Sequence, residues 1–101
     1  LLTATTTGTR WEAPAIKAWG KIDGGGNTLG GSGIASVTSN AGDYTVNFLT
    51  PMPSANYTIQ LTVQGDYKIW VESQTTDNCT IRIVDDSGVA GSAVFFITII
   101  D

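Results

Sequence analysis

The sequence predicts an all-β protein of about seven to eight short antiparallel strands, and three observations support this fold class. Gly, Thr, Ser, Val and Ile are plentiful while Leu, Glu, Lys and Arg are scarce, a composition that favours strands over helices. Several segments alternate apolar and polar residues with the period of two that is typical of half-buried strands. No segment shows an amphipathic helical pattern of useful length.

The middle of the chain predicts a strand, a proline-pinned corner and a second strand. Tyr44, Val46 and Phe48 alternate with polar residues. Pro51 and Pro53 then fix φ and remove two backbone donors, so that the strand pairing ends there. A second alternating strand follows. It starts at residue 57 and ends at residue 64.

The remaining strands are predicted on either side of this unit. Residues 23–33 hold six of the twelve glycines, and we expect a flexible surface loop there, because a phosphate-binding loop would need a following Lys and Ser/Thr or a βαβ context. Asn40–Gly42 and Gly65-Asp66 are expected turns. The other predicted strands are 15–22, 33–39, 67–73, 79–84 and 92–100.

Charge and hydropathy exclude two classes of partner. The net charge is −4 with only five scattered basic residues, which argues against nucleic acid. No apolar stretch reaches the roughly 18 residues of a membrane span, so no membrane insertion is expected. Residues 1–14 are rich in threonine and are interpreted as a linker or the end of a preceding stalk. Residues 15–101 form the predicted domain.

No catalytic, metal or cofactor site is predicted. The chain has one cysteine, Cys79, and no histidine, which argues against a disulfide, a zinc site and a serine triad. The adjacent pair Asp85-Asp86 lacks the spacing of a calcium loop. Turn aspartates commonly serve local hydrogen bonds instead. Six of them are expected at turns or loops: Asp23, Asp43, Asp66, Asp77, Asp85 and Asp86.

Two tryptophans offer the better lead toward binding. Trp70 lies between Lys68 and Glu72 on the face of its strand opposite Ile69, and Trp19 lies between two lysines. Sugar rings stack on exposed indole faces, because these surfaces are apolar at the centre and polar at the rim. Packing of either tryptophan against a neighbouring subunit is the alternative that the sequence leaves open.

The last strand predicts self-association, because it is apolar on both faces. Phe95, Ile97 and Ile99 share one face, and the opposite face includes Phe96 and Ile100. A small domain cannot easily cover one strand from both sides, and an exposed apolar row would promote aggregation. We therefore predict an oligomer interface at Phe95, Ile97 and Ile99. The alternative is that the glycine-rich loop or the N-terminal segment covers this row.

Three segments resemble the C-terminal head domains of bacteriophage tail fibres. They are IKAWGKIDGGG at 16–26, GIASVTSNAGDYTVNFLTPMPSANYTI at 33–59 and VFFITIID at 94–101. The resemblance covers roughly residues 15–101. It implies a small antiparallel β-sandwich, assembled as a homotrimer at the distal tip of a fibre on the virion, with residues 1–14 as the end of the shaft. It also implies attachment to a host cell-surface receptor, either a glycan or a protein, and no enzymatic activity.

On this interpretation the strands are a scaffold and the loops contact the receptor. The expected contact loops are 23–33, 64–67, 74–78 and 85–91. Within and beside them, the candidate receptor-binding residues are Asp66, Tyr67, Trp70, Asp85 and Asp86. Three alternatives remain: a free lectin-like carbohydrate-binding domain, a trimerising fibre cap that does not touch the host, and a fragment of a polysaccharide depolymerase.

Overall fold

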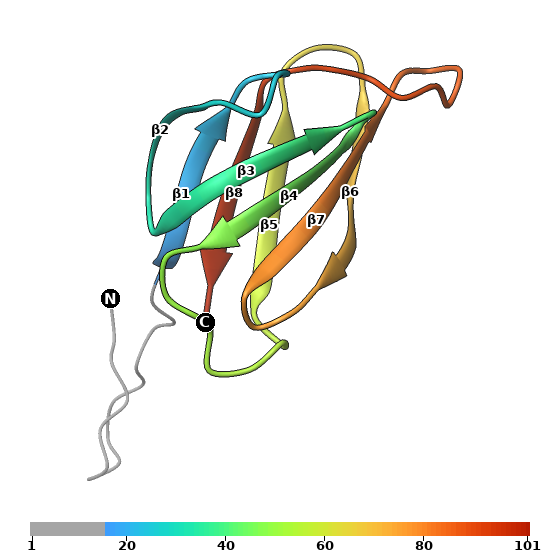
Figure 1. Cartoon of the computed structure of the whole chain (residues 1–101). Helices are drawn as coiled ribbons and strands as arrows, with labels where there is room; N and C mark the ends of the chain where they lie inside the picture. The colour runs from blue at the N-terminus through green and yellow to red at the C-terminus, as the bar shows by residue number, and fades with distance from the viewer. Residues whose placement is uncertain (1–15) are drawn as a thin grey trace, which may run out of the picture.

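Eight strands form two four-stranded antiparallel sheets that pack face to face in this computed structural model, which describes residues 16–101 (Figure 1). The first sheet has the order β2-β1-β8-β5, and the second has the order β3-β4-β7-β6. The strands are β1 (Ile16–Ile22), β2 (Thr28–Ser32), β3 (Ile34–Asn40), β4 (Asp43–Phe48), β5 (Thr58–Val63), β6 (Lys68–Gln74), β7 (Asn78–Val84) and β8 (Phe95–Ile100). The all-β prediction is confirmed, and the two layers fit a sandwich.

Helices are absent from residues 16–101, so this part of the chain holds none that could cross a membrane. The predicted linker, residues 1–14, lies outside the described residues.

The core lies between the two sheets and follows the alternation of the sequence. Every second residue of β4 is buried, and β7 shows the same alternation through Cys79, Ile81 and Ile83. The outward residues of both strands are polar. This pattern gives each sheet one apolar inner face, which is what a two-layer sandwich requires.

Two aromatic pairs connect the sheets near opposite ends of the core. Tyr44 of β4 contacts Phe95 of β8 edge-on, with ring centroids 5.1 Å apart, and Phe48 contacts Tyr57 in the same manner at 5.5 Å. Both buried tyrosines keep a partner for the hydroxyl. Tyr44 donates to the carbonyl oxygen of Gly24 at 2.8 Å, and Tyr57 donates to a carbonyl oxygen of the 75–78 turn at 2.7 Å. The aromatic contacts therefore do not leave a polar atom unsatisfied.

The predicted strand, proline corner and strand are confirmed. The corner also carries the chain from one sheet to the other, because β4 belongs to the second sheet and β5 to the first. Met52, between the two prolines, is buried, and its backbone N–H donates to the Thr76 carbonyl oxygen at 2.7 Å. The prolines stay exposed. The buried Met52 side chain and its backbone hydrogen bond therefore hold the corner against the core, while the two prolines remain at the surface.

The prediction of a flexible loop over 23–33 is wrong for residues 28–32, which form β2 and pair with β1. Glycine is poor in strands by propensity, but it permits close approach of two backbones. A side chain at Gly31 would place its Cβ 2.4 Å from the carbonyl oxygen of Trp19. The segment therefore passes close to the backbone of β1 in the same chain.

Two connections differ in detail from the sequence expectation. Residues 64–67 reverse the chain as predicted, but β5 and β6 lie in different sheets and do not pair as a hairpin. The last strand begins at Phe95 instead of Ser92, because the 85–94 connection crosses between the sheets. Asn40–Gly42 is the expected hairpin turn, with positive φ at Ala41 and Gly42.

The predicted oligomer interface at Phe95, Ile97 and Ile99 is wrong. These side chains are 0%, 1% and 0% exposed, because β8 lies between β1 and β5 and turns this face toward the second sheet. A row that is buried inside one chain cannot be the surface that another chain covers. The outward face of β8 carries Phe96, which is exposed, and the half-buried Ile100.

We expect Phe95→Ala to lower the free energy of unfolding by about 3–5 kcal/mol, because it empties a fully buried site in the core against the Tyr44 ring. The control change Leu49→Ala, at a side chain that is 67% exposed, should cost less than about 1 kcal/mol. Urea unfolding of both variants measures the difference. Similar losses from the two variants would contradict the burial of Phe95 in the core.

Candidate functional site

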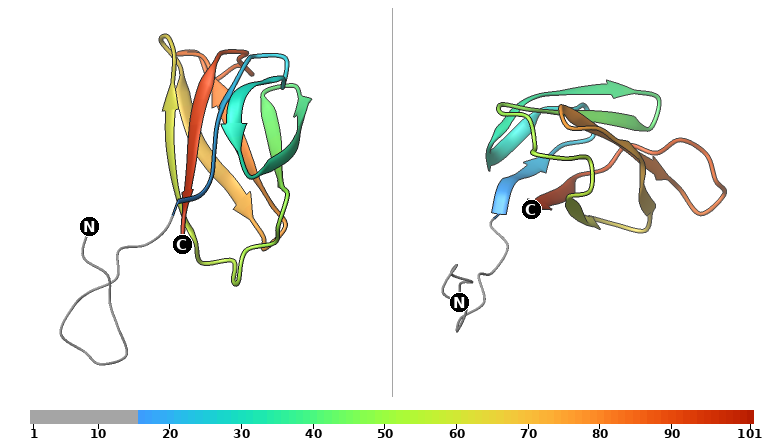
Figure 2. Two further views of the ribbon diagram at one scale, coloured as in Figure 1. Left: turned by 90° about the vertical axis from the view of Figure 1, so that its left-hand side faces the viewer. Right: turned by 90° about the horizontal axis from the view of Figure 1, so that it is seen from below.

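The two ends of the sandwich differ in what they carry. Ile16 pairs with Ile100, so the chain enters and leaves the sandwich at one end, which we call the terminal end (Figures 1 and 2). The opposite end, which we call the far end, carries the connections 23–27, 41–42, 64–67 and 85–94. The turn at 75–77 lies at the terminal end. Two of the four predicted contact loops, 64–67 and 85–91, therefore share the far end with residues 23–27 of a third, and the loop predicted at 74–78 does not.

Asp66 and Asp86 are brought together at the far end from two different loops. Asp66 raises the pKa of Asp86, because its carboxyl group can accept a hydrogen bond from the protonated form of Asp86 and its negative charge opposes ionisation. Lys68 acts in the opposite direction on that pKa. Both aspartates are exposed. They form an acidic, solvent-accessible surface that no other segment covers within residues 16–101.

Two of the predicted receptor residues have structural roles instead. Asp85 Oδ1 accepts hydrogen bonds from the backbone N–H groups of Ser87 at 2.8 Å and Val89 at 3.0 Å, which holds its own loop. The ring of Tyr67 is half-buried against Gly91, where an added Cβ would lie 2.9 Å from Cδ1 of the ring. Neither side chain is well presented to a ligand.

Trp70 is the aromatic residue of the predicted set that faces solvent. Its side chain is 44% exposed on the outer face of the second sheet, and it pairs with Arg82 across the β6–β7 ladder. This placement confirms the prediction that Trp70 lies opposite the core face of Ile69. The indole therefore presents an apolar surface among polar neighbours.

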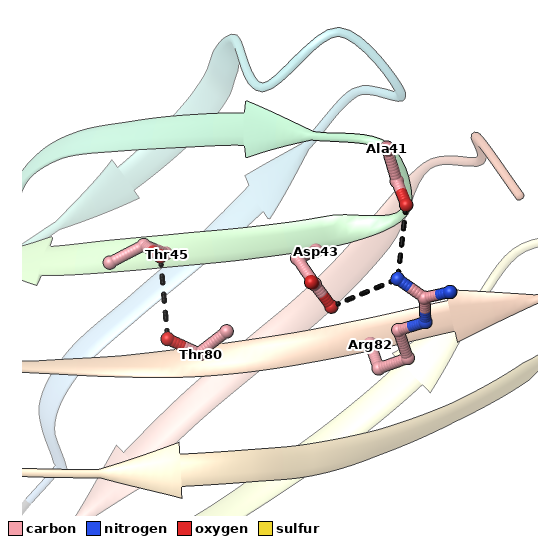
Figure 3. A network of polar contacts seen from close by, with 5 residues as sticks. All are labelled: Ala41, Asp43, Thr45, Thr80 and Arg82. Carbon is pink, nitrogen blue, oxygen red and sulfur yellow. Dashed lines mark hydrogen bonds and ion pairs between the residues drawn. The ribbon is translucent and has the colours of Figure 1, made fainter. Parts of the chain in front are cut away.

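The surroundings of Trp70 include a fixed ion pair (Figure 3). Nη1 of Arg82 lies 3.2 Å from Oδ1 of Asp43, and it also donates a hydrogen bond to the carbonyl oxygen of Ala41 at 3.0 Å. Asp43 Oδ1 is buried and has no hydrogen-bond partner, so its contact with Arg82 is an ion pair only. Both contacts use Nη1, and neither of them involves Nη2 of the guanidinium group.

Glu72 completes a carboxyl pair with Asp43 beside this ion pair. A hydrogen bond from a protonated Glu72 to the Asp43 carboxylate would favour charge on Asp43, so the pKa of Asp43 is lowered and that of Glu72 is raised, while the charge of Arg82 acts to lower each of them. The two groups thus take up a proton at different pH values, and Asp43 keeps its charge to lower pH. This arrangement supplies a strong acceptor at Asp43 next to the donors of Arg82.

The rest of the outer face of the second sheet is made of hydroxyl and amide groups. Thr45 and Thr80 lie opposite each other, with their Oγ1 atoms 3.3 Å apart (Figure 3). Asn78 donates to Asn47 Oδ1 at 3.4 Å, and Asn47 donates to Ser36 Oγ at 3.1 Å. We call this outer face, with Trp70 and Arg82 at its far end, the polar face.

Sequence reasoning did not identify the polar face. The polar residues at every second position of β4 and β7 indicate that each strand has a polar outer face, but not which strands lie next to each other. Their proximity depends on the pairing of Asp43 with Arg82 and of Arg82 with Trp70, which joins three strands. The residue pattern of a single strand does not predict how β4, β7 and β6 align with one another.

The outer face of the first sheet is more apolar. Trp19 and Phe96 are 49% and 38% exposed on neighbouring strands, and Ile16 is exposed at the end of β1. The ammonium group of Lys21 lies 5.5 Å from the centroid of the Phe96 ring, a cation–π distance. The strands of this sheet contain no acidic residue. The two outer faces of the sandwich therefore present different chemistry.

A small cavity of about 250 Å³ opens at the terminal end, away from the predicted receptor residues. Lys17 is its one charged group, so the cavity has no acid–base pair. Within residues 16–101, no three Asp, Glu, Cys or His side chains gather closely enough to hold a metal ion. The cavity is lined by Lys17, Gly33, Thr50, Pro51, Met52 and Pro53.

Comparison with known proteins gives no assignment: no family model matches the chain, and no curated protein matches it significantly. Function is therefore argued from the resemblance of the three sequence segments and from the geometry above.

Burial of Cys79 and Tyr57 makes the fold sensitive to alkali. Burial raises the pKa of the Cys79 thiol from 9.0 to about 12, and that of the Tyr57 phenol from 10.0 to about 12. Between these values the unfolded chain binds fewer protons than the folded chain, so stability falls as the pH rises. The stabilising contribution is fully present below pH 9 and is lost toward pH 12.

We expect the free energy of unfolding to fall by up to about 1.4 kcal/mol per pH unit for each of these groups. In Cys79→Ala the decline should begin about one pH unit later, at the phenol instead of the thiol. Urea unfolding at a series of pH values measures both curves. An identical onset in the variant and the parent chain would contradict burial of the thiol as the cause.

Proposed function

We propose that this chain is a non-catalytic attachment domain at the distal tip of a bacteriophage tail fibre, where it binds a glycan receptor on the host cell surface. The three segments that resemble tail-fibre head domains support the family, and they include β1, the β3–β5 unit and β8. The strands act as a scaffold in this proposal, and the domain belongs to the virion.

The observation that carries the proposal is the separation of the chain ends from the far-end loops. A fibre shaft that continues into Ile16 would meet the domain at the terminal end, and the far end would then point away from the particle. Asp66 and Asp86 lie at that far end, and Trp70 lies beside it. Weak individual contacts at such a tip gain strength from several copies on one particle.

Self-association belongs to the proposal, in the homotrimeric form that the resemblance implies. The buried row of β8 is not available for it, so we assign the interface to the outer face of the first sheet. Trp19 and Phe96 are exposed there on adjacent strands, and exposed apolar side chains that lie together favour a protein partner. Lys21 adds a cation over the Phe96 ring at the rim of this surface.

Attachment is tested by binding of the labelled full chain to a panel of bacterial strains. We expect Asp66→Asn with Asp86→Asn to reduce binding to the recognised strain about tenfold, because multivalent contact amplifies small losses per site. The matched control is Asp77→Asn, which makes the same substitution on an exposed turn at the terminal end. Equal binding by the two variants would remove the far end as the contact surface.

The same assays separate the alternatives. A fibre cap would bind no strain and no glycan, and a free lectin-like domain would bind glycan as a monomer. A depolymerase fragment would release reducing sugar from the host polysaccharide, and we expect no release.

Self-association is tested by sedimentation of the full chain at micromolar concentration. We expect a trimer for the parent chain and a folded monomer for Trp19→Ser with Phe96→Ser, because these changes remove the largest exposed apolar groups of the first sheet. The matched control is Trp70→Ser on the second sheet, which should remain a trimer. A monomeric parent chain would overturn the assembly, and a trimer in the double variant would place the interface elsewhere.

A further inference from the structure

We infer that the end of the polar face around Trp70 is a binding site for an uncharged saccharide, in which Trp70 stacks on the sugar ring and Arg82, Asp43 and Glu72 bind its hydroxyl groups. The inference rests on the proposed attachment function. It adds the location of the site, the roles of the residues and the charge class of the ligand.

The register of three strands brings these groups together. Trp70, Arg82 and Asp43 are successive cross-strand partners on β6, β7 and β4. Neighbouring strands lie about 4.8 Å apart, so the row spans about 10 Å, which is room for more than one sugar ring. Trp70 is the one member of the row with a large apolar surface, and it is 44% exposed. A ring stacked on the indole would place its edge hydroxyls over the next strand.

The polar groups of the row suit hydroxyl ligands and are already oriented. A hydroxyl both donates and accepts, so it needs a donor and an acceptor side by side. Arg82 supplies the donor edge, and the Asp43 and Glu72 carboxyls supply the acceptors. The ion pair to Asp43 and the hydrogen bond to the Ala41 carbonyl hold the guanidinium group in place before any ligand arrives. Little side-chain entropy remains to be lost on binding.

The charges around Trp70 favour a neutral ligand. Carboxyl groups outnumber basic groups on the strands and loops next to Trp70. Asp43 and Glu72 lie on β4 and β6, and the loops that adjoin β6 and β7 carry Asp66, Asp85 and Asp86, against the two basic groups of Lys68 and Arg82. The whole chain also carries a net charge of −4. A uronic, sialic or phosphorylated sugar would meet a surplus of like charge here, and repulsion of like charges raises the free energy of binding. An uncharged saccharide avoids this cost and still uses every polar group.

Trp19 provides an internal comparison on the other sheet. Its exposure is similar, but its cross-strand partners are Ser32 and Thr98, and no strand of the first sheet carries an acidic residue, so a charged acceptor for sugar hydroxyls is missing from the strands around it. Two tryptophans of equal accessibility therefore differ in the chemistry beside them. That difference assigns the saccharide to Trp70.

The test is a printed array of neutral polysaccharides (glucans, galactans and mannans) and acidic ones that contain uronic acid, sialic acid or phosphate. We expect the full chain to bind neutral saccharides only. Calorimetry with an oligosaccharide of the bound polymer then gives the affinity per chain, which does not depend on assembly. Trp70→Ala should lose about tenfold or more in affinity, and Trp70→Phe should retain part of it.

Two further variants test whether binding needs the shape of the guanidinium group or only its charge, and whether it needs this particular tryptophan. Arg82→Lys keeps the charge but loses the planar fork, so the affinity should fall severalfold. Trp19→Ala removes an equally exposed indole and should leave the affinity per chain unchanged. Because the ligand is neutral, added salt should change the affinity little.

Several results would overturn the inference and leave the attachment function standing. One is selective binding to acidic polysaccharides, and another is full affinity in Trp70→Ala. A third is a chain that binds cells but no saccharide on the array, and that loses cell binding in the double variant Asp66→Asn with Asp86→Asn. Failure to bind both cells and saccharides would instead remove the attachment function itself.

Discussion

The inner face of β8 holds this sandwich together, and the rest of the structure depends on it. Phe95, Ile97 and Ile99 are fully buried, and Phe95 meets Tyr44 of the opposite sheet edge-on at 5.1 Å. A domain of this size has one core and little spare apolar surface, so the packing between the layers must come from such a central strand. Since the core uses one face of each sheet, both outer faces are free to differ. They do differ, with an apolar surface around Trp19 on one side and the polar face on the other.

Most strands could be predicted from the sequence, because a strand with one buried and one exposed face has apolar and polar residues at alternate positions. Tyr44, Val46 and Phe48 are the clearest case, and all three are buried. Alternation fails where side chains are missing. β2 contains two glycines in five residues, and its pairing with β1 depends on close backbone approach, which carries no hydrophobic pattern. Alternation also cannot decide which face of a two-faced strand is inside. For β8 that choice follows from its register with β1 and β5, because paired residues point to the same face of the sheet.

The candidate site was predictable only in part, for a related physical reason. Trp70 could be placed on an outer face from the residues around it, and Asp66 could be placed in a turn. The partners Arg82 and Asp43 come from strands that are distant in sequence, so their proximity depends on cross-strand register. Asp85 shows the converse: its sequence context resembles that of Asp86, yet its carboxylate is used by the N–H groups of its own loop. Asp85 and Asp86 therefore differ in availability to a ligand because of hydrogen bonding within the loop, although they are the same type of residue.

The carbonyl oxygen of Gly24 links the far-end loops to the core. It accepts one hydrogen bond from the buried Tyr44 hydroxyl and another from the Ser92 hydroxyl, each at 2.8 Å. The loops that follow β1 and β7 are thereby tied to each other and to an aromatic residue of the core, and the Ser92 hydroxyl is the one exposed side-chain group in this link. The other exposed side chains of these loops take no part in it. Substitutions at those other positions can therefore accumulate without altering the course of the backbone, so the domain can change what it recognises while its framework remains the same.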